Sequence, residues 1–162
     1  MAERVFTQTF GVVAAVLEKD GKILLVKEAS GDDKGKWNMP AGWIDVGQNP
    51  IDMATIEVKE ETGLDFEPTG LIGVFSFIKT YPDNSDGKRL KHPIVLVFRG
   101  NILGGELIKQ NEEIAETRWF SPDEINEMDS TKLRDMNIKQ RIEDYFAGRN
   151  FPLDIIRHTV QE

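Results

Sequence analysis

The sequence predicts an α/β fold built around a mixed β-sheet. Strand-like segments alternate with helical segments along the chain, and short turn signals join several of the strands. Interposed helices together with several hairpins indicate a sheet that contains both parallel and antiparallel pairs. The 162 residues are enough for one domain with a sizeable core and too few for two ordinary ones. We therefore expect a single domain over residues 1–162.

The composition excludes several classes of protein. Hydrophobic residues make up 40% and charged residues 30% of the chain, which is typical of a folded globular protein. A net charge of -8 argues against electrostatic binding of nucleic acid, and the absence of cysteine excludes disulfides and thiolate chemistry. The N-terminus lacks a signal-peptide pattern, and the longest apolar stretch, residues 11–17, is far too short to span a membrane. A cytoplasmic protein without membrane contacts is expected.

The first part of the chain predicts a β-hairpin. Residues 5–19 alternate and then become continuously apolar, which is typical of a strand that enters a core. Asp20-Gly21 is a strong signal for a two-residue turn, and residues 23–26 supply the returning strand. The polar residues 29–35 indicate a loop, and residues 37–39 then lead into the next stretch.

The stretch from Pro40 to Leu64 predicts a tight loop followed by a helix. Asn49 is a suitable N-cap, Pro50 fits the first helical position, and Gly63 is a natural C-terminal stop. Three side chains would anchor one stripe of this helix to a core, namely Ile51, Ala54 and Val58.

The same helix carries three glutamates on one face. Glu57, Glu60 and Glu61 stand at positions i, i+3 and i+4, so their side chains project together. Like charges at i and i+4 destabilise a helix by about 0.2–0.5 kcal/mol, and Lys59 points to the far side. A solvated acidic face would explain this segment taken alone. The glycine-rich loop directly before it favours a metal site instead, since oxygen ligands suit Mg²⁺ or Mn²⁺ rather than zinc.

Further strands and turns are expected downstream. They are a strand over residues 70–79, a turn-rich loop over 81–88, a strand over 90–100, a hairpin turn at Gly104-Gly105 between 102–103 and 107–108, and a short strand over 116–120. Pro93 indicates either an edge position for its strand or the beginning of regular pairing.

Two helices are expected near the C-terminus. Ser121 begins a capping box with proline at the first helical position, which predicts a short helix through about Met128. Residues 133–146 predict an amphipathic helix that Gly148 ends. The final residues, 151–162, have no clear period and form either an irregular tail packed on the domain or a segment used in dimerisation.

The stretch from Gly42 to Leu64 resembles the Nudix box, whose pattern is G-x5-E-x7-R-E-U-x-E-E-x-G-U with U aliphatic. Seven of the nine specified positions match over 23 residues, including the three glutamates of the helix. Gln48 stands where the pattern has glutamate, and Ile56 stands where it has arginine. The chain is identified as a member of the Nudix (MutT-like) hydrolase family. The resemblance implies the Nudix fold, an α/β/α sandwich around a mixed β-sheet.

The resemblance also implies an activity and a set of site residues. The activity is metal-dependent hydrolysis of the diphosphate linkage in a nucleoside diphosphate derivative, which gives NMP and phosphorylated X from NDP-X, or NMP and pyrophosphate from an NTP. In the family's roles, Glu57 and Glu61 would bind Mg²⁺ or Mn²⁺, Glu60 would be a ligand or an orienting residue, and the main-chain carbonyl of Ala41 would be a further ligand. Neighbouring carboxylates should also raise one another's pKa values, so metal affinity should rise with pH.

The two departures from the box can be interpreted physically. In the family, the arginine holds the loop glutamate and helps to orient the first glutamate of the helix. Here Gln48 is neutral and Ile56 is apolar, so neither charge is left without its partner. We expect a working site in which Glu57 is held less firmly, and which is therefore slower or more demanding of metal. The alternative is a Nudix-fold module that binds or senses a nucleotide without cleaving it, which the intact glutamates oppose.

The general base and the substrate contacts remain open. The base could be a box glutamate or a residue of the loop before the 116–120 strand, where Glu113 or Glu112 could serve. By position, the candidates for binding substrate are Trp37, Asn38 and Arg99. Core packing of the tryptophan and an exposed strand-end charge for the arginine are the plainer interpretations. The expected partner is a small nucleotide rather than nucleic acid, and a homodimer is left open.

Overall fold

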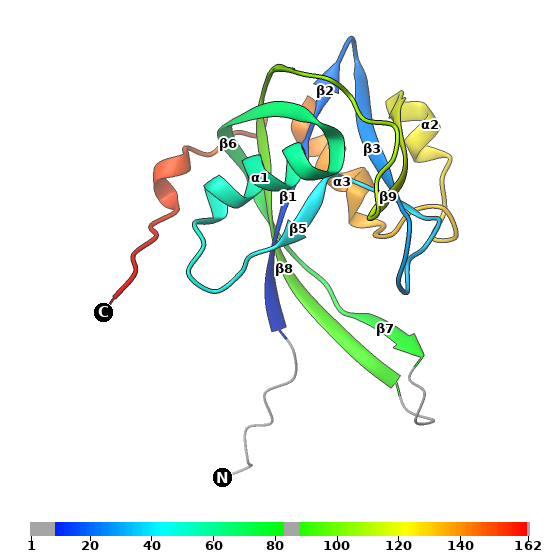
Figure 1. The fold of residues 1–162 in the computed structure, drawn as a ribbon, viewed down its shortest axis with the longest axis horizontal. Helices are drawn as coiled ribbons and strands as arrows, with labels where there is room; N and C mark the ends of the chain where they lie inside the picture. Colours follow the sequence, from blue (N-terminus) through cyan, green and yellow to red (C-terminus); the bar gives the residue numbers. More distant parts are fainter. Residues whose placement is uncertain (1–8, 83–87, 162) are drawn as a thin grey trace.

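The computed structural model describes residues 9–82 and 88–161 (Figure 1). Its elements in chain order are β1 (Thr9–Val16), β2 (Glu18–Lys19), β3 (Lys22–Glu28), β4 (Trp37–Asn38), β5 (Ala41–Trp43), α1 (Pro50–Thr62), β6 (Leu64–Ser76), β7 (Lys79–Pro82), β8 (Lys88–Gly105), β9 (Ile114–Phe120), α2 (Pro122–Asn126), α3 (Asn137–Phe146) and the 3₁₀ helix η1 (Leu153–Ile155). None of the described helices is long and apolar enough to cross a membrane.

The strands form two sheets. In the larger sheet the order is β5-β1-β8-β6, and β7 pairs with the beginning of β8. β1 and β8 run parallel, whereas the other pairs of this sheet are antiparallel, so the prediction of a mixed sheet is confirmed. The smaller sheet contains β2, β3, β4 and β9 in antiparallel pairs.

Two apolar clusters cover the two faces of the strands. Val13 and Ala15 of β1 pack in the cluster that includes α1, whereas Ala14 and Val16 pack in the cluster that includes α2 and α3. Figure 1 shows α1 on one side of the strands and α3 on the other. Because both faces of β1 are buried, its sequence is continuously apolar. This arrangement is the expected α/β/α sandwich.

The predicted N-terminal hairpin is present but shorter than expected. Asp20 and Gly21 both have positive φ angles, 53° and 75°, and Lys19 pairs with Lys22 across the turn. The segment expected as one strand is divided into β1 and β2, which belong to different sheets. Residues 5–8 lie outside the described part of the chain.

The box helix begins and ends where the sequence predicts. The Asn49 side chain accepts a hydrogen bond from the backbone N–H of Ile51 at 2.9 Å, and Pro50 follows as the first helical residue. Gly63 has φ 76° and donates its N–H to the Lys59 carbonyl. α1 therefore starts directly after the box loop, and two of its glutamates, Glu57 and Glu61, contact β5.

The hairpin turn predicted at Gly104-Gly105 is wrong. Both glycines lie in β8 and pair with Asp65 and Leu64 of β6. A Cβ on Gly105 would lie 2.4 Å from the Gly63 carbonyl oxygen, so glycine is required there by close backbone contact rather than by a reversal of the chain. Residues 107–108 form no strand, and the Ile108 N–H donates to the carbonyl of Thr62 at the end of α1.

Other strand boundaries differ from the predicted ones, and pairing with neighbouring strands explains the differences. β6 begins at Leu64, earlier than the expected 70–79 strand, because its first half pairs with the extended end of β8. β8 is an inner strand, so the edge position suggested by Pro93 is wrong. Its pairing with β6 begins at Ile94, but β8 already pairs with β7 from Lys88 and with β1 from His92, so Pro93 does not mark the beginning of regular pairing either. Tyr81 and Pro82, expected in a loop, belong to β7, and residues 83–87 of that loop lie outside the described part.

The C-terminal helices also differ from expectation. The capping box of Ser121 is confirmed, although α2 ends at Asn126. α3 begins at Asn137 rather than at residue 133, because the chain at Leu133 forms a parallel bridge with Trp37. The beginning of the tail packs on the domain, where Phe151 bridges to β6 and where Leu153 and Ile156 contact an apolar cluster. Residues 157–161 are exposed, so both interpretations of the tail stay predictions.

Candidate active site

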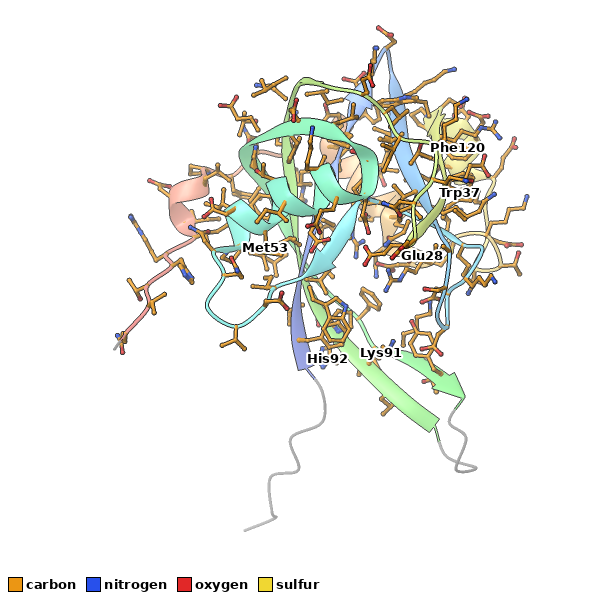
Figure 2. All side chains as sticks on the ribbon, in the orientation of Figure 1. Glu28, Trp37, Met53, Lys91, His92 and Phe120 are labelled. Atoms are coloured by element: carbon orange, nitrogen blue, oxygen red, sulfur yellow. The ribbon has the colours of Figure 1, made fainter. Side chains whose placement is uncertain are left out.

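A pocket of about 370 Å³ lies where α1, β5 and the end of β3 meet the strand pair β7 and β8. Figure 2 labels two residues of its wall, Glu28 at the end of β3 and Lys91 on β8. Five carboxylates line it: Glu28, Asp135, Glu57, Glu61 and Glu113. Sequence reasoning anticipated the last three of these but not Glu28 or Asp135.

Glu57 lies directly against the backbone of β5. A Cβ placed on Gly42 would fall 1.9 Å from the Glu57 carboxyl carbon, so any side chain at this position would displace the carboxylate. This contact gives a physical reason for the glycine that opens the box. Burial raises the pKa of Glu57 to about 7, with further contributions from the charges of Glu60, Glu113 and Asp45.

Glu61 is the most buried carboxylate of the pocket, at 7% exposed. Its Oε2 accepts a hydrogen bond from the backbone N–H of Ala41 at 2.9 Å, which ties α1 to the first residue of β5. Burial raises the pKa of Glu61 well above its usual value, and the charges of Glu28 and Glu57 add to this rise, although the Ala41 hydrogen bond opposes it. The expected mutual repulsion of carboxylates is thus a feature of the site.

Glu28 is held by two groups from other parts of the chain. Its Oε1 accepts hydrogen bonds from the Asn38 amide at 3.2 Å and from Arg134 Nη1 at 2.6 Å. Arg134 lies in the loop before α3, far away in sequence, so no local spacing could have revealed the pair. The only local signal for Glu28 was its own position, as a charged residue at the end of the buried strand β3.

Three other positions of the box lie outside the pocket lining. Glu60, Gln48 and Ile56 are exposed, and none of them lines the pocket wall. The charge of Glu60 nevertheless raises the pKa of Glu57, so the two carboxylates interact electrostatically. Because both departing positions face solvent, a lone charge at either one would cost little stability.

The structure brings only Asn38, of the three residues proposed to bind substrate, into the pocket. Trp37 is 8% exposed and packs edge-on against Phe120 at 4.8 Å in the core, as the plainer interpretation held. Arg99 lies elsewhere, where its Nη1 donates to the Arg149 carbonyl. Burial of the tryptophan between β3 and the helices leaves no face for a ligand.

An unanticipated tryptophan lines the pocket instead. Trp43 directly follows Gly42, is 53% exposed and stacks on Phe10 with ring centroids 4.5 Å apart. A tryptophan directly after the box glycine was the available signal in the sequence.

The donor atoms of the pocket fit a divalent cation. Within residues 9–82 and 88–161, no three histidine, aspartate or glutamate side chains already enclose a metal position. However, Glu57 and Glu61 supply carboxylate oxygens from adjacent turns of α1, and burial, together with the charges of neighbouring carboxylates, raises the pKa of both groups. Mg²⁺ and Mn²⁺ prefer such oxygen donors and require few protein ligands.

Comparisons with known proteins agree with the fold and the family resemblance. A model of the NUDIX domain matches residues 7–141. An ADP-ribose pyrophosphatase of Methanocaldococcus jannaschii is 30% identical over 147 residues, covering 91% of this chain and 79% of that protein. Phosphatase NudJ of Escherichia coli is 30% identical over 144 residues, covering 89% and 88%. A Nudix hydrolase structure from Nitrosomonas europaea superposes with a TM-score of 0.70 at 32% identity, covering 94% and 98%.

The chain belongs to the Nudix family. It is a Nudix pyrophosphohydrolase, which acts on the diphosphate linkage of nucleoside diphosphate derivatives, and family members generally use divalent metal ions.

Replacing Gly42 by alanine should impair the site more than the fold. The new methyl group would push the Glu57 carboxylate out of its place, and a displacement of about 1 Å can cost about 10²-fold in rate. We expect kcat/KM to fall by about that factor with little change in melting temperature, since the displaced atoms end a flexible side chain. Gly104→Ala is the matched control, because its Cβ would meet only an ordinary contact at 3.5 Å. Equal activity of the two variants would contradict this account.

Proposed function

We propose that this chain hydrolyses a small nucleoside diphosphate derivative at the pocket, with Glu57 and Glu61 as the ligands of Mg²⁺ or Mn²⁺. The observation that carries the proposal is the pair of carboxylates fixed by β5, one against Gly42 and the other by the N–H of Ala41. Water adds across the phosphoric anhydride, so that one product keeps the nucleoside monophosphate and the other keeps the second phosphate.

The other proposed roles are based on where each residue lies and on its charge. When bound, the metal ion would supply charge neutralisation on the diphosphate and make water more acidic. The main-chain carbonyl of Ala41 and the carboxylate of Glu60 are proposed as further ligand or orienting groups, because both lie next to the two principal carboxylates. Glu113 is proposed as the general base, since its side chain lines the pocket and its charge acts on Glu57.

The substrate contacts are proposed at the other walls of the pocket. Asn38 and Trp43 both line it, and the stacked pair of Trp43 and Phe10 offers an exposed aromatic surface for a base. Trp37 and Arg99 are less suitable as substrate contacts, because Trp37 is buried in the core and Arg99 lies outside the pocket. The name of the M. jannaschii relative makes ADP-ribose the first compound to test. A cytoplasmic location and a homodimer stay predictions.

The test is product release from a panel of nucleoside diphosphate derivatives, with Mg²⁺ and with Mn²⁺ separately. The panel should include ADP-ribose, a nucleotide sugar, a dinucleoside polyphosphate and nucleoside triphosphates. Metal-dependent formation of a nucleoside monophosphate from one of them supports the proposal. Tight binding of a panel member without any turnover would contradict it.

Metal affinity should rise with pH up to about 7. Below that value Glu57 is mostly protonated, since burial and the charges of Glu60, Glu113 and Asp45 raise its pKa to about 7, and the ion must displace the proton. We expect the affinity for Mn²⁺ to fall by up to about tenfold per pH unit between pH 7 and 5. Calorimetric titration in buffers of different ionisation enthalpy measures both the affinity and the proton release. A flat affinity across this interval would contradict the prediction.

Restoring both charges of the box should improve the site. In Gln48→Glu/Ile56→Arg the new pair would orient Glu57 and add an anionic outer group, so we expect a higher kcat or a lower metal requirement, by about tenfold at most. Both positions are exposed, so the stability should change little. Metal titrations of the activity measure the effect, and an unchanged double variant would show that the departures have no functional cost.

A further inference from the structure

Glu28, at the end of β3 (Figure 2), lines the same pocket as Glu57 and Glu61 but has no role in the proposed chemistry. Its side chain is 17% exposed, so the carboxylate is largely enclosed and still reaches the pocket. Burial raises the pKa of Glu61, and the charge of Glu28 adds to this rise, so the two carboxylates interact electrostatically. Glu28 therefore lies near the proposed metal ligands.

Glu28 and Glu61 are both held by the short stretch that contains β4 and β5. Asn38 Nδ2 donates to Glu28 Oε1 at 3.2 Å, and the Ala41 N–H donates to Glu61 Oε2 at 2.9 Å. Asn38 and Ala41 are three residues apart in the chain. One stretch of backbone thus places a carboxylate of β3 and a carboxylate of α1 at the same pocket.

Arg134 is the second group that holds Glu28. Its Nη1 donates to Glu28 Oε1 at 2.6 Å. Its backbone N–H donates to the carbonyl of Trp37 at 2.9 Å, and its own carbonyl accepts a hydrogen bond from Lys79 Nζ at 2.7 Å. Trp37 precedes Asn38 in β4, so both donors to Glu28 are connected to the same strand.

The two donors reach the same oxygen of Glu28. The other oxygen, Oε2, accepts no hydrogen bond from the described residues, and it is not one of their buried polar atoms that lack a partner, so it stays accessible. Asp135, another carboxylate of the pocket wall, differs in this respect. Its Oδ1 accepts from the Asn137 N–H and its Oδ2 accepts from Arg141. Glu28 thus keeps an open carboxylate oxygen at the pocket, whereas both oxygens of Asp135 are used.

We propose that Glu28 is an outer carboxylate of the metal site, whose Oε2 accepts a hydrogen bond from water around the divalent ion, and that Arg134 positions it. No three acidic or histidine side chains of the described residues enclose one metal position, so Glu28 does not complete a set of direct ligands. Mg²⁺ usually keeps several water molecules, which need acceptors. The inference rests on the proposed function, because it adds residues to the same metal site.

The test measures the affinity of the substrate-free protein for Mn²⁺ alone by calorimetry, and kcat beside it. Glu28→Gln keeps an oxygen that can accept from Arg134 and Asn38 but replaces the open oxygen by an amide donor. We expect the Mn²⁺ affinity to fall by about tenfold or more, as is typical when an outer partner of a metal site is lost. Glu28→Asp keeps the charge but shortens the side chain, and it should lose affinity as well. An affinity that Glu28→Asp retains would overturn the proposed contact, because charge alone would then suffice.

Arg134→Gln tests the positioning role. We expect a fall of about tenfold or more in Mn²⁺ affinity, and no further fall in Glu28→Gln/Arg134→Gln, because Arg134 acts through Glu28. Losses that add up in the double variant would overturn this role, since a general structural effect does not depend on Glu28. Arg134→Lys keeps the charge beside Asp33 and should have an intermediate affinity, which also provides the measurement if Arg134→Gln does not fold.

Glu116→Gln provides the matched control. Glu116 is also a carboxylate beside β3 and is paired with Lys27, but it does not line the pocket. This variant should keep the wild-type Mn²⁺ affinity and kcat. Wild-type affinity in Glu28→Gln, together with loss of the ion in Glu61→Gln, would overturn the inference and leave the proposed function intact. A wild-type protein that binds no Mn²⁺ would count against both.

Discussion

Replacing Glu61 by glutamine should reduce kcat by at least about 10³-fold while the metal-free protein stays folded. A lost metal ligand removes several kcal/mol of stabilisation from the transition state, and each 1.36 kcal/mol corresponds to a factor of ten. The glutamine carbonyl can still accept the hydrogen bond from the Ala41 N–H, so the connection between α1 and β5 is kept. The effect should therefore be confined to chemistry and metal binding.

The stability of this variant should change in the opposite direction from its activity. Burial raises the pKa of Glu61, so ionising this carboxyl group destabilises the metal-free fold, a cost that a neutral amide does not have. We expect the melting temperature without metal to be equal to or above that of the wild type at pH 8, and the gain on adding Mg²⁺ to be lost. Asp52→Asn, an exposed residue of the same helix outside the pocket, should keep full activity. A Glu61→Gln variant that is active would remove this residue from the site.

The parts of the fold that the sequence predicted are those specified by neighbouring residues. Asn49, Pro50 and Gly63 set the ends of α1 through contacts within a few residues, and Asp20-Gly21 sets a turn through its own backbone preferences. By contrast, Gly104 and Gly105 carried a turn signal that tertiary contacts overrode, because β8 continues beside β6. A glycine required for close backbone contact cannot be distinguished from a turn glycine by sequence alone.

The same distinction applies to the site. The box glutamates were found because a helix places positions i, i+3 and i+4 together, whereas Glu28 and Arg134 meet only through the tertiary fold. Trp37 and Trp43 show the limit most clearly. Both stand near the box glycine, but the strand β4 turns the first into the core and β5 places the second at the pocket.

Replacing Asp33 by asparagine should cost about 3–5 kcal/mol of unfolding free energy, since it removes one partner from a group of buried charges. Asp33 is 6% exposed, and its carboxylate accepts hydrogen bonds from Lys79 at 2.5 Å and from the Tyr81 hydroxyl at 2.7 Å. Arg134 Nε lies 3.4 Å away. Without the negative charge these cations lose a counterion at a place that water reaches poorly.

The direction of the Asp33 pKa shift determines how this stability difference depends on pH. Burial would raise the pKa of Asp33, but hydrogen bonds from Lys79 and Tyr81 and the charges of Lys79 and Arg134 outweigh it, so the pKa is lowered. The ionised group therefore stabilises the fold fully above the unfolded value of about 3.9, and this contribution is lost as the pH falls through the lowered pKa. Urea unfolding at pH 7 should separate wild type from Asp33→Asn, and the gap should narrow toward pH 3.

The exposed pair of Asp65 with Lys59 is the matched comparison for Asp33→Asn. Asp65→Asn should cost at most about 1 kcal/mol, since both side chains are about half exposed. If Asp33→Asn cost no more than this control at pH 7, the carboxylate would not hold the fold as inferred. A large loss of unfolding free energy accompanied by a higher KM would show that Asp33 serves both the fold and the pocket. It would then stabilise the fold and also place Lys79 and Arg134 at the wall of the pocket.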